Sequence, residues 1–159
     1  MTNETTLRAE ERREIDQIVA RYPGKQGAAI EALQVVQRHR RWVSDETLGA
    51  VAEYLEMSRD ALDSVATFYN LIYRRPVGRH VILVCDSVSC WLTGYEEVRD
   101  ALQDRLGIGF GETTDDDRFT LIPMACLGAC DRAPVLMIDE DTHRDVTPES
   151  LEDILEAYE

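Results

Sequence analysis

The segment Cys126-Leu127-Gly128-Ala129-Cys130 and the earlier segment Cys85-Asp86-Ser87-Val88-Ser89-Cys90 together contain all 4 cysteines of the chain. Their spacings are C-x3-C and C-x4-C, and a long stretch without thiols separates them. Thiolates on two loops that a fold can bring together suit a two-iron iron–sulfur cluster, in which each iron takes two terminal sulfurs. The pattern therefore predicts an electron carrier.

The same spacings leave three other uses of the cysteines open. Zinc-binding loops also place two to four residues between paired cysteines. Disulfides need an oxidising compartment, whereas residues 1–16 are too polar for a secretory signal and no stretch has the length and apolarity of a transmembrane helix. A thioredoxin-type dithiol would show a C-x-x-C motif, which this sequence lacks. Spacing alone favours the cluster, with zinc as the main alternative.

Charge divides the 159-residue chain into two parts. Its formal net charge is −14, yet residues 1–78 hold 12 acidic and 11 basic residues, whereas residues 79–159 hold 19 acidic and 6 basic ones. The shift predicts a domain boundary near Gly78, beside Pro76. Residues 79–159 are acidic enough to repel nucleic-acid phosphates and anionic lipid headgroups. They favour partners with basic surfaces.

Residues 1–78 are expected to form a small helical bundle. Apolar residues recur at helical spacing, and two serines precede helical patterns as N-caps. The four expected helices cover residues 7–21, residues 27–40, a stretch that starts after Ser44 and a short stretch that starts after Ser58. Nothing on these helices is arranged as a catalytic site.

After Arg79 the pattern becomes strand-like. Residues 80–84 form a β-branched and aliphatic run, which is typical of a strand buried on both faces. The remaining expected elements are a helix over 92–106, strands over 118–123 and 134–138, a turn over 139–143, an edge strand at 145–146 and a helix over 147–158. This order predicts a small layered α/β domain over residues 79–159, with both cysteine loops at one end of its sheet.

Local features of the two loops suit a cluster. Cys85 would leave a strand and Cys90 would enter a helix, so that backbone N–H groups could point at sulfur. Gly128 would let the backbone approach the cluster closely. Leu127 and Ala129 would shield it, and Trp91, directly after Cys90, would either screen the cluster from water or belong to the core. All-cysteine ligation in an acidic half predicts a low reduction potential, nearer the roughly −400 mV of plant-type centres than the Rieske range.

These motifs resemble a known family. The C-x4-C pair, the long spacer and Cys126–Cys130 followed by Ala133-Pro134 are similar to the thioredoxin-like two-iron ferredoxins. The first half resembles the helical part of the E-subunit family of bacterial NADH-quinone oxidoreductases (respiratory complex I), in three segments: Trp42-Val43-Ser44-Asp45, Val65-Ala66-Thr67-Phe68-Tyr69 and Pro76-Val77-Gly78-Arg79. One departure is Ser89, which stands where many relatives have proline.

The resemblance implies a site, a cofactor and a partner. It implies a [2Fe-2S] cluster with four ligands: Cys85, Cys90, Cys126 and Cys130. It also implies a peripheral subunit on the cytoplasmic side of the bacterial inner membrane, placed against a flavoprotein subunit that binds FMN and NADH and among other subunits of the peripheral arm. Such a subunit would exchange single electrons with the flavin and would have no turnover by itself. The alternatives are the equivalent subunit of an NAD-reducing hydrogenase or formate dehydrogenase, and a zinc-stabilised interaction module.

Overall fold

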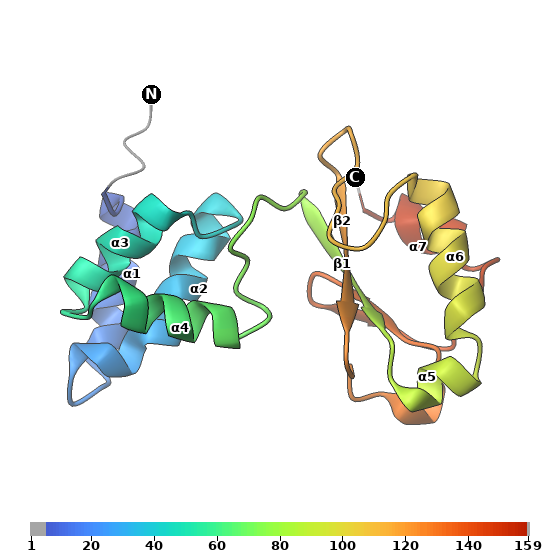
Figure 1. Ribbon diagram of the computed structural model, residues 1–159, viewed down its shortest axis with the longest axis horizontal. Coiled ribbons are helices and arrows are strands. Elements are labelled where there is room, and N and C mark those ends of the chain that lie inside the picture. The colour runs from blue at the N-terminus through green and yellow to red at the C-terminus, as the bar shows by residue number, and fades with distance from the viewer. Residues whose placement is uncertain (1–5, 159) are drawn as a thin grey trace. The chain divides into compact units, whose positions relative to one another are not determined.

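The computed structural model describes residues 6–158 (Figure 1). The chain divides into two compact units, Met1–Pro76 and Val77–Glu159. We call them the helical unit and the sheet unit. Their division lies close to the boundary expected at Gly78.

The helical unit is a bundle of four α-helices, as its apolar periodicity predicts. A short 3-10 helix, η1 (Lys25–Ala28), precedes the second of them. The four α-helices are α1 (Ala9–Val19), α2 (Ala29–Arg40), α3 (Asp45–Tyr54) and α4 (Arg59–Phe68). Their core consists of fully buried aliphatic side chains, among them Ile15, Leu33, Val36, Val51 and Leu62.

Both predicted N-caps are confirmed. The Ser44 hydroxyl accepts a hydrogen bond from the Thr47 backbone N–H at 3.2 Å, and the Ser58 hydroxyl accepts one from the Ala61 N–H at 3.2 Å. Each serine thereby satisfies a donor that the first turn of its helix leaves unpaired. These caps explain why α3 and α4 begin where they do.

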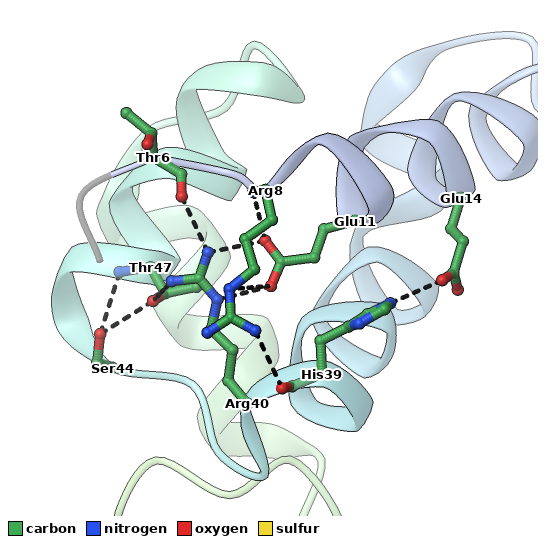
Figure 2. A network of polar contacts seen from close by, with 8 residues as sticks. All are labelled: Thr6, Arg8, Glu11, Glu14, His39, Arg40, Ser44 and Thr47. Carbon is green, nitrogen blue, oxygen red and sulfur yellow. Dashed lines mark hydrogen bonds and ion pairs between the residues drawn. The ribbon is translucent and has the colours of Figure 1, made fainter. Parts of the chain in front are cut away.

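A buried ion pair joins the helices of this unit, and the sequence alone does not reveal it (Figure 2). Glu11 on α1 has no exposed surface, and Arg40 on α2 donates to its two carboxylate oxygens at 2.6 and 2.7 Å. The Arg8 N–H donates to the same carboxylate at 2.7 Å. Arg40 also donates to the Thr47 hydroxyl on α3 and to the Thr6 carbonyl, both at 2.9 Å. The pair therefore holds three helices and the segment before α1 together.

The sheet unit contains one four-stranded sheet with the order β2-β1-β3-β4. Strand β1 pairs parallel with β2 and antiparallel with β3, and β3 pairs antiparallel with β4. The strands are β1 (His80–Cys85), β2 (Phe119–Met124), β3 (Leu136–Ile138) and β4 (Asp141–His143). Two helices, α6 (Tyr95–Leu106) and α7 (Leu151–Glu156), lie on the same face of the sheet (Figure 1) and pack against it through buried Val98, Leu102 and Leu151. The fold is α/β, as predicted.

Three local predictions differ from the structure. Residues 141–143 form strand β4 and not part of a turn, and Asp145–Val146 form no strand. Strand β4 lies at the edge of the sheet with partly exposed side chains, so it needs no apolar run that a sequence could reveal. The helix expected over 92–106 is α6, which begins only at Tyr95; a separate short helix, α5 (Val88–Leu92), precedes it, and Gly94 between them takes a left-handed conformation with φ +113°.

Within residues 6–158, the helices are too short or too polar to cross a membrane.

Candidate metal centre

The parallel pairing of β1 and β2 brings the two cysteine loops together. Cys85 is the last residue of β1, and its partner in the register is Met124, the last residue of β2. The pairing extends one step further, since the Asp86 N–H donates to the Met124 carbonyl at 3.0 Å. Cys126 follows Met124 closely in the chain, so both loops leave the sheet at the same end.

The C-x3-C pair has the spacing of two sulfurs on one metal. The Sγ atoms of Cys126 and Cys130 lie 3.9 Å apart, and both residues are exposed. Two thiolates on a tetrahedral metal with bonds of about 2.3 Å lie about 3.8 Å apart. The Gly128 N–H donates to the Cys126 sulfur at 3.4 Å, so the backbone of this loop already turns toward sulfur. This pair fits one iron of a two-iron cluster.

Gly128 adopts a left-handed backbone conformation. Its φ is +76°, and a Cβ at this position would meet no protein atom within 4 Å. An L-residue would be strained here by its backbone conformation rather than by crowding from the surrounding protein. Gly128 therefore sets the shape of the loop that carries Cys126 and Cys130.

The C-x4-C pair is buried. Cys85 is 2% and Cys90 1% exposed, and they pack with Ala129 and Val135. Cys90 lies inside α5, which begins at Val88. The sequence predicted a helix start only after Cys90, so helical structure begins earlier than expected. Burial and, after it, the hydrogen-bonded Cys85 thiol together raise the pKa of the Cys90 thiol to about 11, against a backbone hydrogen bond from Val135 that lowers it. Without a metal the Cys90 thiol holds its proton, and metal binding must displace it.

The two pairs are in electrostatic contact. The charge of Cys130 contributes to the raised pKa of Cys90, and the charge of Cys85 contributes to the raised pKa of Cys130. The main cause at Cys130 is its hydrogen bond with the Cys126 thiol, while a hydrogen bond from the Ser89 hydroxyl lowers the pKa. The four sulfurs therefore form two neighbouring pairs. Across residues 6–158, no three side chains of histidine, cysteine, aspartate or glutamate gather in a way that could hold one ion.

The shielding expected from nearby apolar residues is met in part. Ala129 is buried and Leu127 packs beside it against the buried cysteines. The side chain of Trp91 is 58% exposed, because α5 turns Cys90 toward the interior and the next residue, Trp91, toward solvent. Two hydrogen-bond donors to sulfur were not foreseen, the Ser89 hydroxyl and the Val135 N–H. No sequence motif marks either residue as a donor to sulfur.

Comparisons with known proteins bear on this site. The model of the family described as thioredoxin-like [2Fe-2S] ferredoxin matches residues 15–159, which include all four cysteines. The NADH-quinone oxidoreductase E subunit of Pseudomonas aeruginosa is 48% identical over 157 residues, covering 99% of this chain and 95% of that protein. The protein of the same name from Escherichia coli K12 is 48% identical over 152 residues, covering 96% and 92%.

A solved structure shares the fold. The crystal structure of an NAD+-reducing [NiFe]-hydrogenase in the H2-reduced state superposes with a TM-score of 0.70 at 21% identity. The match covers 81% of this chain but 22% of the hydrogenase chain. At this identity the similarity shows a shared fold and nothing more. The evidence for a [2Fe-2S] cofactor is the family match together with the two thiol pairs.

Proposed function

This chain belongs to the family of thioredoxin-like [2Fe-2S] ferredoxins, and from that membership we propose that it is the electron-transferring E subunit of an NADH-quinone oxidoreductase. In this proposal its ligands to the cluster are Cys85, Cys90, Cys126 and Cys130. The observation that carries the proposal is the meeting of two thiol pairs at one end of the sheet, one of them with sulfurs 3.9 Å apart. A two-iron cluster needs two sulfurs on each iron, which this arrangement offers.

The bound cluster supplies a centre that accepts and releases one electron at a time. The surrounding residues set the conditions for this transfer. Buried Cys85 and Cys90 keep water from one half of the site, while the exposed Cys126 and Cys130 leave the other half open to a partner. Backbone N–H groups of Val135 and Gly128 donate to sulfur and stabilise its negative charge.

The proposed partner is a flavoprotein subunit that oxidises NADH through FMN and exchanges single electrons with this cluster. The chain would lie in the peripheral arm of the complex, on the cytoplasmic side. Relatives named as the E subunit of NADH-quinone oxidoreductase support this assignment along nearly the whole chain. The alternative, a subunit of an NAD-reducing hydrogenase, is supported by the shared fold. The proteins that copurify with the chain distinguish this alternative from an NADH-quinone oxidoreductase.

The proposal is tested by reducing the cluster through the flavoprotein. We expect the anaerobically purified protein to show the electron paramagnetic resonance signal of a reduced [2Fe-2S] cluster when NADH and the FMN-containing subunit from the same organism are both added. NADH without the flavoprotein should give no signal, because nothing in the proposal lets this chain oxidise NADH. A cluster that dithionite reduces but that NADH with flavoprotein leaves oxidised would contradict the proposed partner.

A further inference from the structure

Helix α5 exposes an apolar surface. Val88 is 65%, Trp91 58% and Leu92 74% exposed. In the part of the sheet unit that the structure describes, residues 77–158, these are the large apolar side chains that face solvent, and all of them lie on this five-residue helix. A water-exposed tryptophan and leucine side by side are costly unless another surface covers them.

This surface borders the cysteine site. Cys90 lies on α5 between the exposed residues Val88 and Trp91, with its own side chain buried. Cys90 also packs in one buried cluster with Ala129, which belongs to the other cysteine loop. Figure 1 shows α5 at the same end of the sheet unit as the orange segment that follows β2. A protein that covered α5 would therefore lie beside both thiol pairs.

The charges around this surface are negative. Asp86 precedes α5, Glu96 and Glu97 follow it, and Asp131 follows Cys130; all four are exposed. Within residues 6–158, Asp86, Glu96 and Glu97 take part in no ion pair. The basic residues nearest to them in the sequence, Arg99 and Arg132, are already paired with Asp100 and Asp145.

We propose that the apolar surface of α5 is where the electron-exchange partner docks, and that the partner offers an apolar depression edged by lysine and arginine. This inference rests on the proposed function, and it specifies which surface of the chain that function uses. A second copy of the chain is a poor occupant, because the same acidic residues would then face each other across the contact. A basic rim would attract them, and the apolar centre would be removed from water.

The test measures binding of the cluster-loaded protein to the purified FMN-containing, NADH-oxidising subunit from the same organism. Trp91→Ser and Leu92→Ser each remove apolar contact area, and we expect each to raise the Kd by roughly tenfold or more. Leu71→Ser, at an exposed leucine of the helical unit, should leave the Kd unchanged.

The acidic residues around α5 are tested separately. Glu96→Lys should also raise the Kd and weaken its dependence on salt, whereas Glu140→Lys on the β3–β4 turn should do neither.

Each variant is first compared with the wild type by its visible spectrum and by its reduction with dithionite, which needs no partner. A variant that loses its cluster is replaced in the comparison by Glu96→Lys, whose side chain is exposed. If Trp91→Ser and Leu92→Ser hold the cluster and bind the flavoprotein as the wild type does, this inference is wrong and the proposed function stands. If the wild type neither binds the flavoprotein nor takes electrons from it, the proposed function fails as well. A wild-type dimer that Leu92→Ser separates, without any binding of flavoprotein, would identify a second copy as the occupant and overturn the inference.

Discussion

Cys126 and Cys130 hold their sulfur atoms 3.9 Å apart on a loop whose shape Gly128 sets with a φ of +76°. This pair is exposed, while Cys85 and Cys90 are buried next to it. The proposed two-iron site thus has one protected and one accessible half. This arrangement and the buried ion pair of the helical unit lead to four predictions.

Cys126→Ser should give protein with little or no intact cluster and a less stable sheet unit, because metal binding contributes to the free energy of folding. The helical unit should keep its structure, since its core contains no part of the site. Iron content and the visible spectrum measure the first effect, and hydrogen exchange of each unit measures the second. Ala125→Ser is the matched control: it adds the same hydroxyl at the exposed neighbouring position and removes no sulfur.

Gly128→Ala should lower the stability of the sheet unit by about 1 kcal/mol and also speed the loss of the cluster, because alanine is strained at positive φ. Gly111 makes a sharp control, since it also has positive φ, +82°, and an added methyl group would meet nothing within 4 Å. Gly111→Ala should cost similar stability and leave the rate of cluster loss unchanged. Equal rates of cluster loss in the two variants would show that strain anywhere in the unit, and not the shape of the cysteine loop, governs retention.

Arg40→Met should destabilise the helical unit by roughly 3–5 kcal/mol, because it leaves the fully buried Glu11 carboxylate without its main partner. Arg21→Met provides the comparison. Arg21 pairs with Glu31 at 3.2 Å, but its side chain is 61% exposed, so about 0–1 kcal/mol is expected. Urea unfolding followed by hydrogen exchange in α1 to α3 measures both. Similar losses in the two variants would contradict the structural importance of the buried pair.

The same ion pair predicts a pH dependence. Burial raises the pKa of Glu11, but hydrogen bonds from Arg40 and the Arg8 backbone, with the charges of both arginines, outweigh burial and hold the pKa below its usual 4.5. A carboxyl group with a lowered pKa in the folded state stabilises the protein above its unfolded pKa and loses that contribution as the pH falls. The stability of the helical unit should therefore fall between about pH 5 and pH 3. Glu11→Gln should make this fall smaller, and an unchanged fall in that variant would show that other carboxyl groups cause it.

Much of this fold could be predicted because its signals are local. Ser44 and Ser58 mark helix starts through their own side chains, and the run over residues 80–84 marks a central strand by its apolar composition. Strand β4 could not be predicted, because a polar edge strand forms through its pairing with β3 and not through any pattern in its own residues. The helix break at Gly94 could not be predicted either, since glycine permits such a break but does not require one.

The sequence predicted that the two cysteine loops meet at one end of the sheet, but not how their side chains are arranged there. The spacing of the cysteines pointed to two metal-binding pairs, and the parallel pairing of β1 with β2 explains why those pairs meet. Which pair is buried, and that Trp91 faces solvent, depend on how α5 packs against the sheet unit. The Glu11–Arg40 pair likewise joins residues on different helices, so only the tertiary structure reveals it.

The central claim is that the two cysteine loops together hold a pair of irons. It is tested most directly by measuring iron, acid-labile sulfide and zinc in the full-length protein purified without oxygen, together with its electron paramagnetic resonance spectrum after reduction. We expect about two irons and two sulfides per chain, little zinc, and a signal from a cluster that carries one added electron. Colourless protein with one zinc per chain, no sulfide and no signal on reduction would contradict it.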